Sequence, residues 1–343
     1  MTTIRRITAL IVLLASLMAV PITTSFAEAS AESVVVINNL GLVDPVAITA
    51  HGKYVWIADL GGDGKNGQVV RVTASTGAHL SITSPLLNDP SDLISDGSYV
   101  WVVNGTHFVP ANASISRIDI ATNKVTLVRK LSSTGFPSLA IAGRYLWVSG
   151  VSYPALLRIN RTTLSTTKVT SKLFLGVGAI AADRHYLWVA RDDGGPLGRG
   201  SLSRVSLATG AVKGVNSPFF NDPVTVTSNG AFVWMPASEH VVVKVDIANG
   251  KTVKVSSKSF STSQWIESTP RDVYVLSEGG NPAGPGGTLT QIIAATYSVH
   301  VITSKLFTAL RGLAVLGSHV WVINSLPTPN GPHTMNLLMR VTP

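Results

Sequence analysis

Three aspartates that each stand directly before a proline have the clearest potential for binding chemistry: Asp44, Asp89 and Asp222. If the fold gathers them, three carboxylates could bind a divalent cation such as calcium, or a basic group of a ligand. An Asp–Pro step can also simply begin a strand, with the aspartate side chain bonding the local backbone. Both interpretations remain open at the level of sequence, so no resident cofactor is predicted.

Further acidic and histidine side chains lie in glycine-rich or irregular segments. These candidates are Asp59, Asp63, His107, Asp192, Asp193, Glu239, His240 and His333. The segment from Asp59 to Gly67 has oxygen ligands and glycines, but it lacks the alternating aspartates and the downstream glutamate of a calcium loop, which favours a hairpin loop. The histidines form no His-x-x-x-His pair, and we predict no shared metal site. The adjacent Glu239 and His240 are the candidate pair for acid–base chemistry.

The composition excludes several classes of protein. Of 343 residues, 45% are hydrophobic and 13% are charged, which is unlike a disordered charged chain and provides ample material for a core. Cysteine is absent, which excludes a disulfide framework, a thiolate zinc site and a cysteine nucleophile. The net charge of +9 is distributed along the chain rather than clustered with aromatic residues, so we predict no nucleic-acid partner.

The N-terminal segment has the pattern of a secretory signal peptide. Arg5 and Arg6 precede an apolar run from Ile7 to Val20, and small residues follow as far as Ala29. The run is shorter than the roughly 20 residues that a transmembrane helix needs. We therefore expect cleavage after Ala27 or Ala29, with residues 1–29 as signal peptide, residues 30–343 as the mature domain, no membrane anchor after cleavage, and an extracellular or periplasmic location.

The remainder of the chain contains two repeated motifs. The first is an aromatic residue, an aliphatic residue, tryptophan and another aliphatic residue, and it recurs at intervals of 40 to 47 residues. Its central aromatic residues are Trp56, Trp101, Trp147, Trp188, Trp234, Tyr274 and Trp321. The second motif follows each copy and centres on Arg71, Arg117, Arg158, Arg204, Lys244, Gln291 and Arg340. We expect the tryptophans to pack between neighbouring units and the basic residues to lie on exposed faces or donate hydrogen bonds between units.

Each repeat reads as four short strands separated by glycine-, asparagine- or threonine-containing turns, without a sustained helical period. Four strands in about 44 residues is typical of one blade of a β-propeller. The last repeat ends after its third strand, whereas the segment Ser33–Asn38 is an unpaired strand before the first repeat. Pairing Ser33–Asn38 with Leu337–Thr342 would close a ring of seven blades and protect an open edge. The predicted fold class is therefore all-β, a seven-bladed propeller in a single domain.

Units that read Gly-x-Tyr-Val-Trp-Val and then Ser-Arg-Ile-Asp-x-x-Thr resemble the YVTN/NHL-type propellers, in particular the YncE-like and streptogramin-lyase-like secreted bacterial proteins. The resemblance covers roughly Ser33 to Pro343 and implies the propeller fold. Within that group, functions range from peptide or glycan binding to metal-dependent ring opening. Members with lyase activity carry a glutamate shortly after the tryptophan, whereas this chain has Asp59, Asn104 or Gly150 near that place.

These observations favour a secreted, monomeric binding or interaction module for a small ligand, a peptide or a glycan. The expected site is the mouth of the central channel, at Asp44, Asp89 and Asp222, together with the long segments after the tryptophan strands. Those segments are 58–68, 103–114, 190–201, 277–288 and 324–336. A lyase or hydrolase related to streptogramin (virginiamycin B) lyase is one alternative, and a structural protein of the cell envelope is another.

Overall fold

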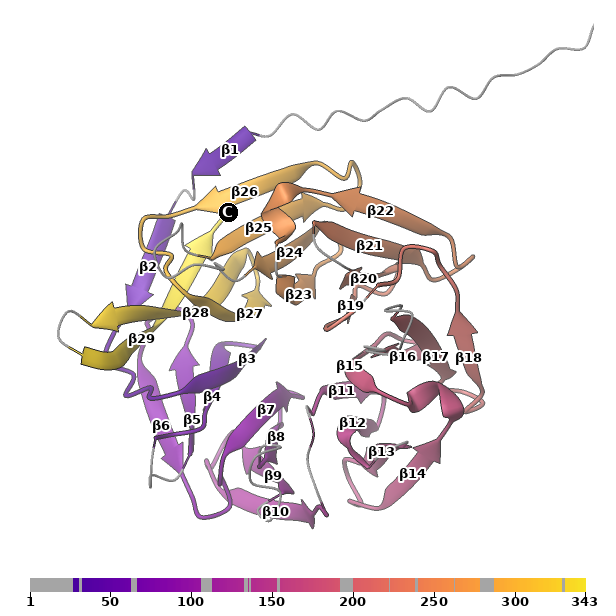
Figure 1. Ribbon diagram of the computed structural model, residues 1–343. Coiled ribbons are helices and arrows are strands. Elements are labelled where there is room, and N and C mark those ends of the chain that lie inside the picture. The colour runs from indigo at the N-terminus through magenta and orange to yellow at the C-terminus, as the bar shows by residue number, and fades with distance from the viewer. Residues whose placement is uncertain are drawn as a thin grey trace, which may run out of the picture.

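The protein is a ring of seven β-sheets around a central axis, as a computed structural model shows (Figure 1). The structure describes residues 27–343 with the exception of 31–32, 63–66, 106–112, 133–134, 136, 153–154, 192–199, 222, 238–239, 262, 278–286 and 329–330. In every blade the strand that begins the repeat lies nearest the axis, and the following strands of the repeat pair antiparallel outward from it (Figure 1). The predicted seven-bladed β-propeller is confirmed.

The first four blades follow the sequence repeats without interruption. Blade 1 contains β3 (Pro45–His51), β4 (Tyr54–Asp59), β5 (Gln68–Thr73) and β6 (His79–Thr83). Blade 2 contains β7 (Pro90–Ser95), β8 (Tyr99–Asn104), β9 (Ser114–Asp119) and β10 (Val125–Lys130). Blade 3 contains β11 (Leu139–Ala142), β12 (Tyr145–Ser152), β13 (Ala155–Asn160) and β14 (Thr166–Thr170). Blade 4 contains β15 (Val177–Ala182), β16 (Tyr186–Arg191), β17 (Ser201–Ser206) and β18 (Val212–Val215).

The last three blades are less regular. Blade 5 contains β19 (Thr227–Ser228), β20 (Phe232–Pro236), β21 (Val241–Asp246) and β22 (Thr252–Ser256). Blade 6 contains β23 (Ser263–Ser268), β24 (Asp272–Ser277), β25 (Thr288–Ile293) and β26 (Val299–Thr303). Blade 7 contains β27 (Leu310–Leu316), β28 (His319–Thr328), β29 (Gly331–Thr342) and the N-terminal strand β2 (Ser33–Ile37). Two 3-10 turns, Lys172–Phe174 and Lys258–Phe260, lie between blades.

The ring closes as the sequence predicts. Strand β2 pairs antiparallel with β29, with Ser33 opposite Thr342 and Ile37 opposite Leu338. The last blade is therefore built from both ends of the propeller sequence, which protects the outer edge of β29. A short strand, β1 (Ala27–Ser30), adds a fifth strand to blade 6 in parallel with β26, and the repeat pattern gave no indication of it.

The repeated tryptophans pack between blades, which confirms their predicted role. Trp56 of blade 1 is fully buried and packs with Leu93, Val100 and Ile118 of blade 2. The same arrangement recurs with Trp101 against blade 3. Because the aromatic residue of one blade fills the hollow of the next, the ring has seven similar apolar walls instead of one central core.

Each repeated basic residue lies across from the tryptophan of its own blade and covers the neighbouring aromatic ring. The Arg117 guanidinium carbon, for example, is 4.5 Å from the Tyr99 ring centroid and 5.9 Å from that of Trp101. Arg71 also donates to the Ile120 carbonyl and to Asn123 Oδ1 of blade 2. The repeated basic residues are therefore stacked cations. Arg71, Lys244 and Arg340 also donate hydrogen bonds to the next blade, which is one of the two alternatives predicted for them.

A third repeat, which sequence analysis missed, fixes the crossovers from one blade to the next. In five crossovers a serine side chain accepts a hydrogen bond from the backbone N–H two residues later, and an apolar residue three positions after the serine is buried. The serine–apolar pairs are Ser84–Leu87, Ser171–Phe174, Ser217–Phe220, Ser257–Phe260 and Ser304–Phe307. This serine turn directs a large side chain inward where the chain approaches the central axis.

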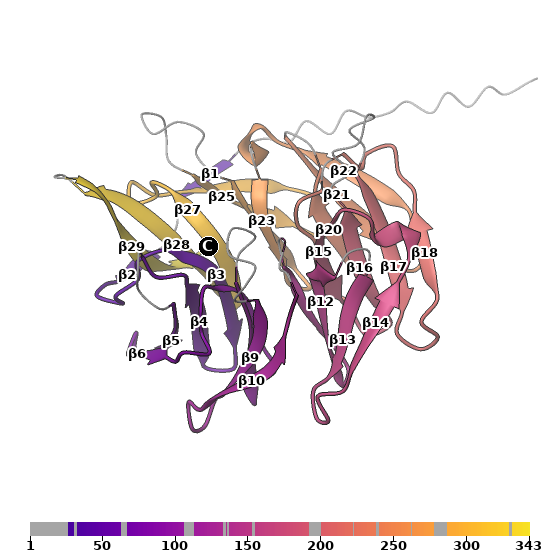
Figure 2. The same cartoon turned by 60° about the horizontal axis from the view of Figure 1, so that its bottom comes forward.

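The segment 324–336 is not the irregular loop that we expected. Strands β28 and β29 continue through it to Thr328 and from Gly331, and the resulting hairpin projects beyond the body of the ring (Figures 1 and 2). At its base, Asn336 donates to the Val43 carbonyl and accepts a hydrogen bond from Ser325. The polar sequence resembled a loop, but a two-stranded ladder satisfies its backbone groups.

Candidate functional site in the central channel

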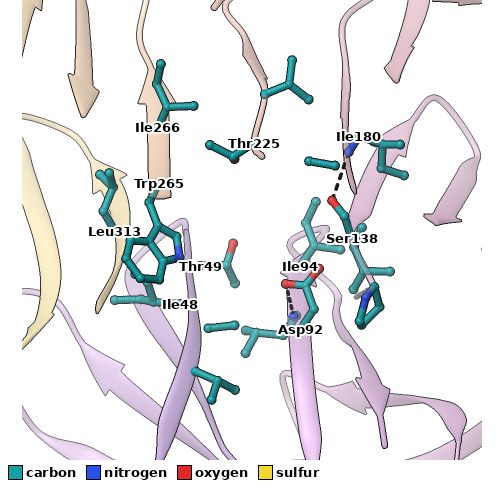
Figure 3. Close-up of a pocket in the computed structure, with 18 of the residues that line it drawn as sticks. Ile48, Thr49, Asp92, Ile94, Ser138, Ile180, Thr225, Trp265, Ile266 and Leu313 are labelled. Carbon is teal, nitrogen blue, oxygen red and sulfur yellow. Dashed lines mark hydrogen bonds between the residues drawn. The ribbon is translucent and has the colours of Figure 1, made fainter. Parts of the chain in front are cut away.

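The inner strands of all seven blades enclose a cavity of about 440 Å³ on the ring axis (Figure 3). A second volume of about 370 Å³ lies toward the hairpins that join the first and second strands. Both volumes contact Ile94, Leu139, Ile180, Val226 and Glu267, so they are two compartments of one channel. We call the first the wide compartment and the second the hairpin compartment.

Most of the residues that line the wide compartment have apolar side chains, but polar atoms form the larger part of its exposed surface. Its polar residues are Thr49, Ser91, Asp92, Ser138, Thr225 and Glu267, and it also contains Trp265. Among the lining residues that the structure describes, two are acidic and none is lysine, arginine or histidine. A concave wall that combines apolar side chains with polar groups can hold a small ligand that has both apolar and polar parts.

Asp92 is the acidic residue on β7. Its Oδ1 accepts a hydrogen bond of 2.8 Å from the Leu93 backbone N–H, and the backbone of Leu139 in blade 3 also contributes. Enclosure by the channel wall raises the pKa of Asp92 to about 7, and these backbone bonds only partly oppose the shift. The carboxyl group points into the cavity in Figure 3.

Glu267 on β23 belongs to blade 6 and contacts both compartments. Desolvation raises its pKa to about 7, against the effect of one backbone hydrogen bond from Ser268. Blades 2 and 6 are not neighbours in the ring (Figure 1), so Asp92 and Glu267 approach the ligand space from different sides. The channel thus holds two carboxyl groups that lose their protons near neutral pH.

Trp265 supplies the large aromatic surface of the wide compartment. It pairs with Leu276, which is two residues after the motif aromatic Tyr274, and Asp92 pairs with Val103, which is two residues after Trp101. Trp265 and Asp92 therefore occupy equivalent positions in their blades and lie at one level of the channel. Figure 3 shows the Trp265 ring beside Thr49, across the cavity from Asp92. Because side chains two apart on a strand share a face, Glu267 lies on the same side of β23 as Trp265.

A charged network closes part of the hairpin compartment. Arg161 forms an ion pair of 2.5 Å with Asp96 and donates to the Gly143 carbonyl, and Trp101 Nε1 donates to Asp96 at 2.9 Å. Burial opposes the charge of Asp96, but hydrogen bonds from Trp101, the backbone and Arg161 outweigh it and lower its pKa. The network joins blades 2 and 3, so its charges are already satisfied within the protein.

The predicted rim is only partly within the described structure. Asp44 has a side chain 47% exposed and approaches Arg311 at 3.6 Å. Partial burial raises its pKa, although Arg311 opposes this shift and Asp59 adds to it. Asp89 is half-buried in a left-handed backbone conformation with φ of 54°, and Asp222 lies outside the described residues. Cation binding at this rim stays a prediction.

Asp59 and His240 have structural roles that do not require a ligand. Asp59 is completely buried and accepts hydrogen bonds from the Val43, Asp44 and Gly61 backbone N–H groups and from Gln68. It therefore fixes the entry into β3. His240 is an exposed turn residue whose backbone bonds to Phe260 and Ser257.

The other loop candidates lie outside what the structure describes. Asp63, His107, Asp192, Asp193 and Glu239 are in the segments omitted above, and the side chain of His333 in β29 is likewise outside the description. Their roles stay predictions. Within the described parts of the chain, no three histidine or acidic residues gather as a metal site would require.

Sequence reasoning missed Asp92, Trp265 and Glu267, although the repeat contained a signal. The positions that match Glu267 in blades 1, 2 and 3 are Thr49, Ile94 and Ala140, which all pair with the motif tryptophan. A glutamate at such a position, and a tryptophan two residues before it, both depart from the repeat. Departures on inner strands were the feature to look for.

Comparisons with known proteins identify the fold and no more. No family model matches the chain, and no curated protein matches its sequence. A chain in a crystal structure of a nidogen/laminin complex is similar in fold, with a TM-score of 0.52 and 11% sequence identity, over 73% of this chain and 95% of that one. The similarity agrees with a β-propeller, which is compatible with an interaction module. Among the described residues, no helix has the length and apolar character to cross a membrane.

Proposed function

We propose that the protein is a secreted binding module that holds a small ligand in the wide compartment of its central channel. The observation that carries this proposal is the contrast between the repeated blades and the channel wall. Side chains from seven blades meet at one cavity of about 440 Å³, and those with the most binding chemistry, Asp92, Trp265 and Glu267, are absent from the repeat. The rigid ring would hold these groups in place, which lowers the entropic cost of binding.

The position of strand β2 supports the secretion part of the proposal. Cleavage after Ala27 or Ala29 would remove some or most of β1, whereas β2 begins at Ser33 and would remain whole. The predicted processing therefore leaves ring closure intact. The test is N-terminal sequencing of protein from an expressing bacterial culture. A start at Glu28 or Ser30 in the exported fraction supports secretion, and a chain that retains residues 1–29 contradicts it.

A channel-filling variant tests the binding site. Val224 lines the wide compartment and is 39% exposed, so a Val224→Trp substitution adds bulk within the channel. Leu127 on the outer strand β10 has the same exposure, and Leu127→Trp is the matched control. A ligand that binds only the folded state raises its melting temperature by mass action.

The measurement is a thermal-shift screen of a small-molecule panel against the three proteins. The expected result is a group of compounds that raise the melting temperature of the parent and of Leu127→Trp, but not that of Val224→Trp. Compounds that stabilise all three proteins equally would locate binding outside the channel and overturn the proposal.

A further inference from the structure

We propose that the ligand of the wide compartment is a small organic cation, with an ammonium group attached to an apolar body. This inference rests on the proposed function and specifies the chemistry of the same site. Four observations carry it: the sign of the channel charge, the lack of cationic partners for its carboxyl groups, an uncovered aromatic ring, and the apolar remainder of the wall.

The charge of the wide compartment is opposite to that of the protein. The full chain has a net charge of +9, yet the described residues that line this compartment include Asp92 and Glu267 and no basic residue. Arg161, which lines the hairpin compartment, bonds to Asp96, and Arg311, which precedes the lining residue Gly312, approaches Asp44. His51 contacts only the hairpin compartment. A wall of this charge attracts cations and repels anions.

Among the described residues, the two carboxyl groups have only backbone N–H groups as partners. Asp92 accepts from Leu93 and Leu139, and Glu267 accepts from Ser268. An enclosed carboxyl group without a cation keeps its proton to a higher pH, and the pKa values near 7 express this. A bound ammonium group would supply the missing positive charge and displace the proton.

Trp265 differs from the other tryptophans in having an aromatic face that no cation covers. In the blades, the guanidinium or ammonium groups of residues such as Arg204 and Lys244 lie over the motif aromatic rings at 3.6 to 6.0 Å. Within the part of the chain that the structure describes, no lysine or arginine lies over Trp265 in this way. Its half-buried ring faces the cavity in Figure 3 and can receive the cationic group of a ligand.

The rest of the wall suits an organic body better than a metal ion. Ile48, Ile94, Ile180, Ile266 and Leu313 line the compartment between its polar groups. A hard divalent ion needs about six oxygen ligands, whereas no cluster of three acidic or histidine residues exists among the described residues. An apolar ligand body can bury against the isoleucines while its ammonium group reaches a carboxylate.

The experiment is isothermal titration calorimetry of the mature protein with charged probes and neutral probes of similar shape. The charged probes are benzyltrimethylammonium and hexylammonium, the neutral probes are benzyl alcohol and hexanol, and calcium chloride tests the metal alternative. The variants are the double substitution Asp92→Asn with Glu267→Gln, and the control Asp119→Asn, which changes a partly exposed carboxylate outside the channel, at the end of β9. Circular dichroism and thermal melting establish that each variant is folded.

At pH 8 we expect the ammonium probes to bind the parent and the Asp119→Asn control, and to bind the double variant at least about tenfold more weakly. Because a carboxyl group of pKa about 7 is ionised roughly one part in ten at pH 6, affinity for the parent should fall about tenfold at that pH. Titrations in two buffers of different ionisation enthalpy should detect proton release upon binding.

The outcomes separate this inference from the proposed function. Neutral probes that bind as well as the charged ones, with binding lost in Val224→Trp, would keep the channel site and overturn the organic cation. Calcium binding without ammonium binding, ammonium binding that the double variant retains, or no ammonium binding at millimolar concentration would also overturn it. Binding of any probe that Val224→Trp does not affect would instead count against the channel itself.

Discussion

Tryptophan and charged side chains occur both in the stacks between blades and in the wall of the central channel. The two regions differ in whether these side chains have partners within the protein. In the stacks, Trp101 is completely buried, and Arg117 lies over it with its guanidinium carbon 5.9 Å from the ring centroid. In the channel, Trp265 is half-buried and lines the cavity, although it also packs against the apolar wall between blades 6 and 7. Among the described residues, Asp92 bonds only to backbone groups. In the stacks each cation is paired with its aromatic rings within the protein, although several indole N–H groups, such as that of Trp147, have no hydrogen-bond partner among the described residues. Among the same residues, no lysine or arginine lies over the Trp265 ring.

The difference separates what stabilises the propeller from what can bind. A stack uses its cation and its rings to join adjacent blades, and it recurs in every blade except blade 6, which has Tyr274 and Gln291 at these positions. Side chains that line the channel do not have to fit the surface of the next blade, so each inner strand can carry a different residue there. Repeated aromatic and basic residues thus indicate stability here, whereas unrepeated ones on inner strands indicate function.

Removal of strand β2 should have the largest effect on stability, because this strand completes blade 7 and closes the ring. Deletion of residues 33–37 removes the ladder with β29 and exposes its edge. We expect the melting temperature to fall by more than about 10 °C and aggregation to increase. A chain that begins at Ala31 keeps β2 but loses β1 and is the control, with little expected change. Equal melting temperatures for both truncations would show that closure does not depend on β2.

Exchange of tryptophan for alanine in the two regions tests the comparison directly. Trp147 is 2% exposed within an inter-blade wall, so Trp147→Ala should lower the free energy of unfolding by about 3–5 kcal/mol. Trp265 lines the cavity but also packs against the wall between blades 6 and 7, so Trp265→Ala should cost less than Trp147→Ala, roughly 2 kcal/mol. Chemical denaturation measures both values. Similar losses in the two variants would mean that Trp265 is part of the framework after all.

The smallest expected change is a gain in stability that depends on pH. Asp92 keeps its proton in the folded protein up to about pH 7, whereas in the unfolded chain it ionises near pH 4. The unfolded state therefore binds fewer protons between these values, and the stability of the parent decreases as the pH rises from about 4 to 7. Asp92→Asn removes this penalty.

We expect Asp92→Asn to be more stable than the parent by about 2 kcal/mol at pH 8, with a much smaller difference at pH 4. Denaturation by urea at both pH values checks this expectation, and Asp119→Asn should show no such gain because the pKa of Asp119 is lowered, not raised. A gain of equal size at both pH values would mean that burial of the Asp92 charge is not its cause.

Much of the framework was predictable because the repeat itself encodes it. The spacing of Trp56, Trp101 and the later copies predicted the blades, and the unpaired strand at Ser33 predicted the closure with Leu337–Thr342 that the structure confirms. The serine turns of the crossovers also recur along the chain. Their common pattern was missed because the buried residue is leucine in one turn (Leu87) and phenylalanine in the others, such as Phe174. The predicted rim of Asp44, Asp89 and Asp222 remains to be tested.

By itself, the sequence determined the number of blades, their strand order, the inter-blade role of the tryptophans and the way the ring closes. These features depend on contacts within one repeat or between successive repeats, so a local pattern records them. Only the tertiary structure decided that Asp92, Trp265 and Glu267 meet at one cavity. Asp92 is more than 170 residues from the other two, and nothing in its local sequence requires a partner. Closure of the ring brings these residues together, because every inner strand then faces the same axis.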